Sequence, residues 1–237
     1  MTNFKETVLK EYKYKIELHA HTTPASKCSE INPSELVATY RSENYSGLVL
    51  TNHFYPWQSK TGLGFKKYID EHLKDFEKVK TLGETANMKI YLGVELNFEE
   101  NANDYLVYGI DEDFIRHGIS RKMKTLEDFV SSVDRRDILI IQAHPFRKNM
   151  TLAPENLVDG IEVFNLHPNH NSRVGYASRY AEDLSRCVCT CGTDFHHRGQ
   201  ACLTALLARE MPENEKALAK LIREEPVYKA GNAVITF

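Results

Sequence analysis

The sequence lacks several features that would place a protein in a specialised class. No apolar run approaches the roughly 20 residues of a membrane-spanning helix, so no membrane partner is expected. The N-terminal stretch, 1–14, is charged and has no apolar core, which argues against a signal peptide. The five cysteines are an odd number, which fits a reducing cytoplasm better than a disulfide framework.

The sequence also lacks a strong excess of one charge, and it contains no repeats, linkers or low-complexity segments. A net charge of -3 is not the basic footprint typical of nucleic-acid-binding proteins, so it disfavours that partner without excluding a local basic patch. What is present is an ordinary globular composition, 42% hydrophobic and 27% charged, over 237 residues. That length predicts one domain, 1–237, with a sizeable core.

Apolar segments alternate with helical patterns along the whole chain. Strands are predicted at 16–21, 47–53, 89–98, 105–110, 138–143, 160–164 and 186–192. Helices are predicted at 32–44, 65–85, 125–135, 168–184 and 213–224, with Asn32 and Thr125 as N-caps, and a strand or hairpin at 227–237. Near-continuous apolar strands between helices favour a parallel sheet, and seven of them favour a closed α/β barrel of TIM type. Active sites of such barrels lie at the carboxyl ends of the strands.

The first predicted strand ends in two histidines, His19 and His21. In a strand, residues i and i+2 point to the same side. The two imidazoles can therefore face one point in space. Neutral imidazole suits zinc, manganese or iron, so the pair indicates a divalent metal.

The ends of four other predicted strands also carry residues that bind metals. They are His53, Glu95, His144, Asp194, His196 and His197. Six of the ten histidines of the chain thus stand at strand ends, on what would be a single rim. Glu95 or Asp194 could bridge two cations held about 3.5–4 Å apart, as two-metal hydrolases require.

Five short motifs, in order along nearly the whole chain, resemble those of the PHP family, named for its polymerase and histidinol phosphatase members. They are His19-Ala20-His21, Thr51-Asn52-His53, Gly93-Val94-Glu95, Ala143-His144-Pro145 and Gly192-Thr193-Asp194-Phe195-His196. The resemblance implies a distorted seven-stranded (βα) barrel with two or three divalent metals (zinc, manganese or iron). It also implies phosphoester hydrolysis by a metal-activated water, with Glu95, Asp194 and His144 as catalytic residues.

The same resemblance assigns the ligands. It implies a first metal at His19, His21, Glu95 and Asp194, a second at Glu95 and His144, and a third at His53 and His196. Three positions depart from the family pattern. Asn52 stands where the family commonly has Asp. The first loop offers only Cys28, Ser29 and Glu30 where the family carries a His or Asp, and only Asp111 could substitute for the histidine expected after the fourth strand. We therefore expect one tight metal, a weaker second, and a third that Cys28, Glu30 or substrate phosphate would complete.

Several other residues are candidates for substrate contacts. Arg147, Arg173 and Arg198 follow predicted strands, and an arginine fork suits phosphate. Asn165, His167, His170, Tyr55 and Trp57 could line the pocket, and His197 is expected to point away from it. Cys187, Cys189 and Cys191 alternate on the last strand, where a thiolate metal site is an alternative to plain core packing.

The function predicted is hydrolysis of a small phosphomonoester or nucleotide. Two other enzymatic functions stay open: a metal hydrolase of amidohydrolase type, and an exonuclease acting on nucleic-acid ends. A metal-stabilised scaffold without activity is the non-enzymatic alternative.

Overall fold

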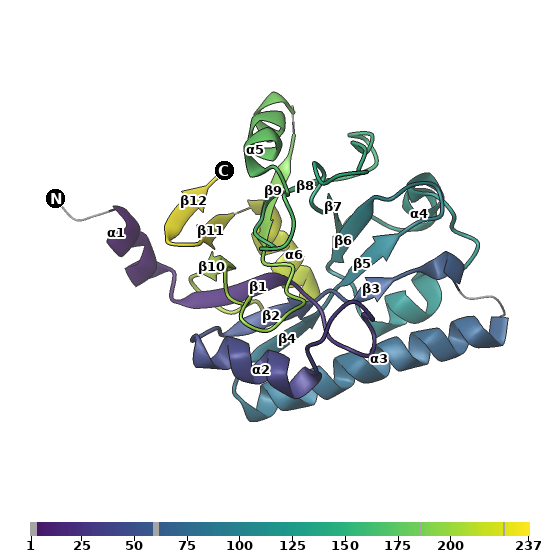
Figure 1. Ribbon diagram of the computed structural model, residues 1–237, viewed down its shortest axis with the longest axis horizontal. Coiled ribbons are helices and arrows are strands. Elements are labelled where there is room, and N and C mark those ends of the chain that lie inside the picture. The colour runs from purple at the N-terminus through teal and green to yellow at the C-terminus, as the bar shows by residue number, and fades with distance from the viewer. Residues whose placement is uncertain (1–3, 59–61, 185, 225) are drawn as a thin grey trace.

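A computed structural model of the chain describes residues 4–58, 62–184, 186–224 and 226–237 (Figure 1). The helices are α1 (Phe4–Glu11), α2 (Pro33–Ser42), α3 (Gly62–Thr85), α4 (Leu126–Ser132), α5 (Val174–Asp183) and α6 (Glu215–Glu224), with a 3₁₀ turn η1 (Pro56–Gln58) and a π-helical turn η2 (Phe114–Gly118). The strands are β1 (Tyr14–Ala20), β2 (Gly47–Leu50), β3 (His53–Phe54), β4 (Lys89–Leu92), β5 (Val94–Asn97), β6 (Asp104–Tyr108), β7 (Leu139–Gln142), β8 (Gly160–Asn165), β9 (Val188–Gly192), β10 (Thr204–Ala208), β11 (Val227–Ala230) and β12 (Ala233–Thr236).

These strands form two six-stranded sheets within a mixed α/β fold. One sheet has the order β12-β11-β10-β1-β2-β4, and the other has the order β3-β5-β6-β7-β8-β9. The sheets meet where Ala20, at the end of β1, forms a parallel bridge with Phe195. The described strands therefore form two sheets where the sequence predicted one closed barrel.

Strand direction also differs from the all-parallel prediction. Parallel pairs join β1 to β2 and β2 to β4 in one sheet. In the other sheet they join β3 to β5, β7 to β8 and β8 to β9. However, β6 runs antiparallel to β5 and β7, and β10 runs antiparallel to β1. The connection from β5 to β6 spans only residues 98–103. A parallel pair needs a crossover of a dozen or more residues, so this short loop enforces a reversal of direction.

Both predicted N-caps are confirmed. The Asn32 side chain accepts hydrogen bonds from the backbone N–H groups of Ser34 and Glu35, and Thr125 caps α4 in the same way through Asp128. Each cap is part of a capping box, which satisfies N–H groups that the first helical turn leaves free. The structure also contains α1 and β10, which the sequence analysis did not predict.

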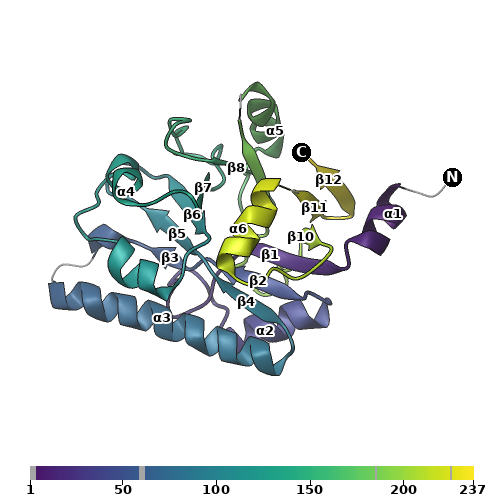
Figure 2. The ribbon, with the colours of Figure 1, turned by 180° about the vertical axis from the view of Figure 1, so that it is seen from behind.

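One buried cluster draws its side chains from strands of both sheets and from α6. Ile16, Val49, Leu106, Ile141 and Leu206 are among its members, together with Leu218 and Ile222 of α6. Figure 2 shows α6 across the back of the molecule, whereas α2 and α3 lie along its lower side in Figure 1. The helices thus cover the sheets from outside and leave the opposite face, where β1, β5 and β9 end, for the site.

Among the described helices, none combines the length and the apolar character that a bilayer crossing would require.

Candidate metal centre

Four side chains from both sheets converge where the sheets meet. His19 lies in β1 and His21 directly after it, Glu95 lies in β5, and Asp194 follows β9. His19 Nε2 lies 3.3 Å from Glu95 Oε1 and 3.4 Å from Asp194 Oδ1. His21 Nε2 lies 3.4 Å from Glu95 Oε2 and 3.4 Å from the same Asp194 oxygen. The structure thus brings together the four residues expected at the first metal.

These spacings fit a divalent cation. Donor atoms bound about 2.0–2.2 Å from one zinc ion stand about 2.9–3.5 Å from each other, depending on the coordination geometry. Nε2 of both histidines and Oε2 of Glu95 are buried and make no hydrogen bond to any residue that the structure describes. Buried polar atoms normally have partners, so a donor set with these free positions suits a metal ion.

A second group of donors lies around the same Glu95 carboxylate. His144 Nε2 is 3.1 Å from Glu95 Oε1, and His53 Nδ1 is 2.9 Å from Oε2. Asp104, the first residue of β6, joins His53 and Glu95 in a group whose donor atoms all lie within 4.8 Å of one another. Glu95 therefore has candidate ligands on both sides, which is the position expected of a bridging carboxylate.

Asp104 is a candidate ligand that the sequence analysis missed, and Asp111 does not take that place. Because β6 runs antiparallel to β5, its first residue reaches the site and its last residues point to the opposite end of the sheet. Asp111 lies beyond that opposite end, where its side chain accepts a hydrogen bond from the backbone N–H of Phe114. The six-residue loop before β6 was the signal in the sequence that could have identified Asp104.

Buried negative charge dominates the electrostatics of the site. Burial opposes ionisation of Glu95, but the imidazoles of His53 and His19 outweigh it and hold the pKa of the carboxyl well below its usual range. Burial and the neighbouring Glu95 carboxylate raise the pKa of Asp104 to about 6. For His19, burial lowers the pKa, but Glu162, Asp194 and Glu95 outweigh it and raise the pKa well above its ordinary value. The carboxylates thus favour positive charge at this point, which a bound cation would supply.

Hydrogen bonds behind the histidines fix which ring nitrogens face the centre. His19 Nδ1 donates to Glu162 Oε1 at 2.8 Å, which leaves Nε2 for the centre. The Ser26 hydroxyl donates to Asn52 Oδ1, so it accepts from His21 Nδ1 at 3.1 Å and leaves the Nε2 of that ring as well. Such outer partners set the tautomer and orientation of metal-binding histidines. Asn52, one of the departures from the family pattern, acts here by holding Ser26.

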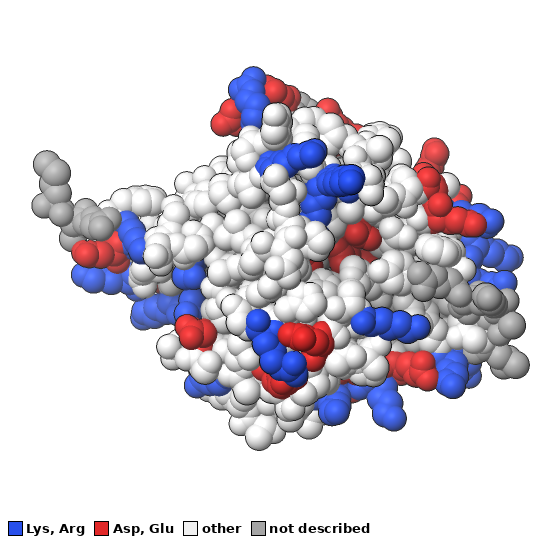
Figure 3. Space-filling view, in the orientation of Figure 1, with Lys and Arg blue, Asp and Glu red and all other residues white. Residues whose placement is uncertain are grey.

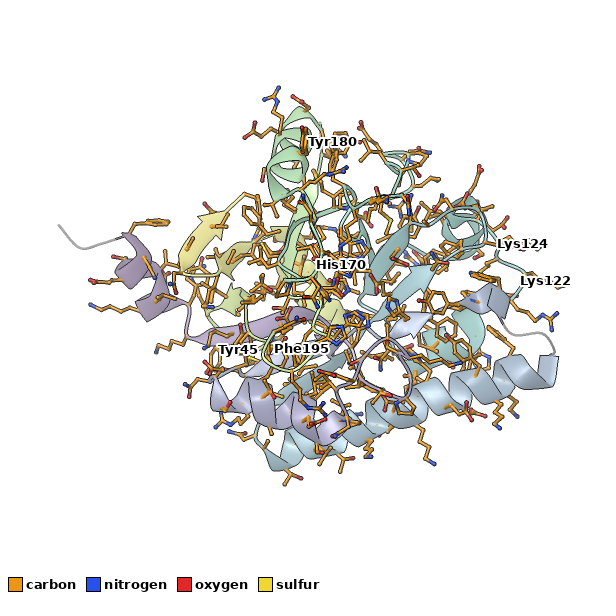
Figure 4. All side chains as sticks on the ribbon, in the orientation of Figure 1. Tyr45, Lys122, Lys124, His170, Tyr180 and Phe195 are labelled. Atoms are coloured by element: carbon orange, nitrogen blue, oxygen red, sulfur yellow. The ribbon has the colours of Figure 1, made fainter. Side chains whose placement is uncertain are left out.

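The buried side chain of Glu17 fixes the position of the turn that carries Asp194. Its buried carboxylate accepts hydrogen bonds from the backbone N–H and the hydroxyl of Thr193, at 3.0 and 2.5 Å, and from the Tyr40 hydroxyl at 3.0 Å. The Tyr40 ring makes edge contacts with Tyr45 and Phe195, both labelled in Figure 4. Because Asp194 follows Thr193 directly, this network places the ligand-bearing turn against β1.

Backbone strain accompanies two of the candidate ligands. His144 has φ = 32° and Asp194 has φ = 55°, both in the left-handed region that residues other than glycine rarely adopt. Each such conformation costs on the order of 1–3 kcal/mol and persists only where the surroundings impose it. The strain points to a functional constraint at these two strand ends.

The open side of the site holds further histidines and one cysteine. Ring nitrogens of His21, His53 and His196 lie within 4.8 Å of one another, and His167 groups likewise with Asp194 and His196. Figure 4 labels His170 near the middle of this face, where its ring centroid is 4.5 Å from that of His167. Burial raises the pKa of the Cys28 thiol, but hydrogen bonds with His196 and His53 outweigh it and lower the pKa to about 6.

Of the three arginines predicted to contact substrate, Arg147 contacts the site directly. Its Nη2 donates to Asp194 Oδ2 at 2.5 Å and to Asn165 Oδ1 at 2.6 Å. Arg173 is exposed at the start of α5. Arg198 is also exposed, and its Nη2 lies 2.7 Å from Glu35 Oε1. The structure therefore places one of the three guanidinium groups against a candidate ligand.

The remaining candidates lie around the rim or outside it. Glu30 accepts a hydrogen bond from the backbone of Arg198, and His197 faces Glu30 at the surface. The three cysteines of β9 do not share one environment: Cys187 and Cys189 pack with β8 and α5, whereas Cys191 belongs to the cluster that contains α6. The Sγ atoms of Cys187 and Cys189 lie 3.8 Å apart, but Cys191 packs in a different cluster, so the three thiols do not form one group.

Figure 3 shows acidic side chains recessed in a hollow in the middle of this face, with basic side chains above it. A pocket of about 1000 Å³ adjoins the candidate centre and runs along α3. Cys28, His53 and Tyr55 line it, together with Lys27, Lys74 and Lys78 among others. The Tyr55 ring stacks on His53, and Trp57 packs edge-on against Tyr55 with 39% of its surface exposed.

No protein-family model matches the sequence, and no curated protein matches it either. Solved structures do resemble the fold. A two-domain protein from Bacteroides vulgatus, containing a predicted PHP-like metal-dependent phosphoesterase, has a TM-score of 0.64 and 14% identity over 94% of this chain, which spans 66% of that protein. PsfC from Pseudomonas syringae has a TM-score of 0.59 and 16% identity, with 87% of each chain covered.

An amidohydrolase from Chromobacterium violaceum, solved with bound sulfate and no metal, has a TM-score of 0.51 and 15% identity, with 78% of this chain and 88% of that one covered. At these low identities the likeness is one of fold. The chain has a mixed α/β fold similar to that of these solved structures, and side chains able to bind metal ions cluster where its two sheets meet.

Proposed function

We propose that this protein is a metal-dependent phosphoesterase that acts on a small phosphorylated substrate. The observation that carries the proposal is the convergence of His19, His21, Glu95 and Asp194, with donor atoms 3.3–3.4 Å apart and buried nitrogens left free. His144, His53 and His196 extend this set to a second and a third position. When bound, divalent cations supply Lewis-acid activation of water and of the phosphoryl oxygens.

The protein itself contributes orientation and charge. Nη2 of Arg147 is held by Asp194 and Asn165, and its Nε donates to Ser172 Oγ at 3.2 Å, whereas Nη1 makes no hydrogen bond to a described residue. We infer that Nη1 binds a phosphoryl oxygen, because a fixed planar guanidinium suits phosphate. Arg173 and Arg198, which were also predicted to contact the substrate, are given a smaller part in binding it than Arg147.

The pocket along α3 suits the organic part of a small substrate. Its volume of about 1000 Å³ is at the upper end of the range for small-molecule sites, about 300–1000 Å³. We further infer that the chain folds as a single barrel-like domain. In support, the bridge between Ala20 and Phe195 joins the two sheets, and one core cluster includes side chains from both.

Measurement of phosphate release tests the proposal. The purified protein would be assayed against a panel of phosphomonoesters and nucleotides, with zinc or manganese and with a chelator. We expect metal-dependent phosphate release, with Arg147→Lys raising KM and Arg179→Lys leaving it unchanged. Arg179 is a suitable control because it is an exposed arginine of α5 that pairs with Glu182 and Asp183.

Parallel assays with amide substrates and with nucleic acids separate the alternatives. Hydrolysis of amides but not of phosphoesters would indicate an amidohydrolase, for which the Chromobacterium violaceum structure is the specific reason. Degradation confined to nucleic-acid ends, and lost at raised salt, would indicate an exonuclease. A melting temperature raised by metal, with all panel compounds intact, would refute phosphoesterase activity and indicate a scaffold.

A further inference from the structure

Asp75 is a buried carboxylate of α3 that is not among the candidate ligands but binds residues next to two of them. Only 5% of its surface is exposed. Its Oδ2 accepts a hydrogen bond from the Thr22 hydroxyl at 2.5 Å and another from Asn52 Nδ2 at 2.9 Å. Thr22 directly follows His21, and Asn52 directly precedes His53. A side chain of α3 is therefore connected to both chain segments that carry these histidines.

The contacts of Asn52 fix the orientation of its amide. Its Oδ1 accepts from the backbone N–H of Thr22 at 2.7 Å, and a backbone N–H can only donate. Its Nδ2 faces the carboxylate of Asp75, which can only accept when it is ionised. Asn52 therefore presents an acceptor to the loop after β1 and a donor to α3.

That orientation decides how the buried Ser26 hydroxyl can bond. Ser26 Oγ lies 2.9 Å from Asn52 Oδ1, so the hydroxyl donates its one proton there. Its two lone pairs then accept from the backbone N–H of His53 at 2.9 Å and from His21 Nδ1 at 3.1 Å. One hydroxyl thus holds the ring of His21 and the backbone of His53.

We infer that Asp75 is a positioning residue, which acts through Asn52 and Ser26 to hold the ring of His21 with Nε2 toward the metal position. Two acceptors face Asn52 Nδ2, the Asp75 carboxylate and, at 3.0 Å, the Thr22 hydroxyl. The carboxylate is the one that carries no proton and so cannot exchange its role with a donor. Such outer partners tune metal affinity by orienting the ligands. This inference rests on the proposed metal-dependent function.

Exchange of the amide and the carboxylate tests the inference. In Asn52→Asp two carboxylates face each other with no donor between them, so above neutral pH we expect zinc affinity to decrease about 10-fold, the lower end of the range for partners of metal-binding histidines. The double variant Asn52→Asp with Asp75→Asn puts the donor on α3 and keeps the acceptor beside Ser26, so zinc affinity should return close to the wild-type value. Asp70→Asn is the matched control and should bind zinc as the wild type does, because Asp70 is an exposed residue of α3 that pairs with Arg116.

A further variant separates positioning from support of the fold. Ser26→Ala removes the link between Asn52 and His21, so adding Asn52→Asp to it should weaken zinc binding no further. Zinc affinity would be measured by competition with a chromophoric chelator, and thermal unfolding of the metal-free protein would check the fold. If Asn52→Asp does not fold, Asp75→Leu, which removes the acceptor, takes its place in this comparison.

Three results would overturn the inference: losses of affinity that add up in the Ser26→Ala background, wild-type zinc affinity in a folded Asn52→Asp variant, or a double exchange that does not restore affinity. With metal-dependent phosphate release by the wild type intact, these results would refute only the role of Asp75. Absence of zinc binding by the wild-type protein would refute the proposed function as well.

Discussion

Glu162 provides the most specific test of the centre, because it binds three groups there without facing the metal position itself. Its Oε1 accepts from His19 Nδ1 at 2.8 Å, and its Oε2 accepts from the His144 backbone N–H at 3.1 Å and from Asn165 Nδ2 at 2.8 Å. The change proposed is Glu162→Gln. The amide of glutamine has only one accepting oxygen, so it cannot accept both from His19 and from the pair of donors on His144 and Asn165. Its NH₂ group would then face donors in the place of the other oxygen.

The magnitude follows from these contacts. A hydrogen bond to a charged group contributes about 1.5–3 kcal/mol, and Glu162→Gln forfeits at least one. If the lost bond is the one that fixes the orientation and tautomer of His19, zinc affinity should decrease about 10–100-fold. A decrease of this size is typical when the partner of a metal-binding histidine is changed. That decrease corresponds to about 1.4–2.8 kcal/mol of binding free energy.

Zinc affinity would be measured by competition with a chromophoric chelator, with thermal unfolding as the check of the fold. Asp159→Asn is the matched control. Asp159 is a partly buried carboxylate, whereas Glu162 is fully buried, and Asp159 accepts from the backbone N–H of Ile140 at 2.9 Å. It immediately precedes β8 and is remote from the centre. Unchanged zinc affinity in a folded Glu162→Gln variant would refute the assignment of His19 Nε2 as a ligand.

Three further predictions concern the centre and one buried histidine outside it. His19→Ala should abolish activity and reduce bound metal, whereas Cys189→Ser should leave activity largely intact; the reverse result in a phosphate-release assay would contradict the site assignment. Gly192→Ala should reduce zinc affinity in the same competition assay, because a Cβ there would lie 2.1 Å from Glu162 Oε1 and 2.6 Å from the His19 Cβ, and wild-type affinity would contradict this packing. Burial lowers the pKa of His72 to about 4, below the value of about 6.5 in the unfolded chain. The unfolded state therefore takes up the proton first, so this residue should reduce the free energy of unfolding by about 3 kcal/mol as the pH falls from about 7 to 4. Urea unfolding should show that this loss is absent in His72→Leu, and an unchanged pH dependence would contradict it.

The sequence by itself determined the local elements and most of the candidate centre. Side chains two residues apart share one side of a strand, so His19 and His21 could be paired before the structure was known, and the rings do lie side by side. Capping chemistry is equally local, which is why Asn32 and Thr125 were identified as N-caps. Glu95 was expected among the metal-binding side chains because parallel strands place their carboxyl ends on one edge.

Tertiary structure alone decided what depends on strand direction and on contacts between distant segments. Asp104 reaches the centre because β6 is reversed, and that reversal exchanges the two ends of the strand relative to its neighbours. No role was predicted for Glu162, because its contact is with His19, 143 residues away in the sequence. Pairing across such separations is fixed by how the two sheets meet, which no local pattern of residues encodes.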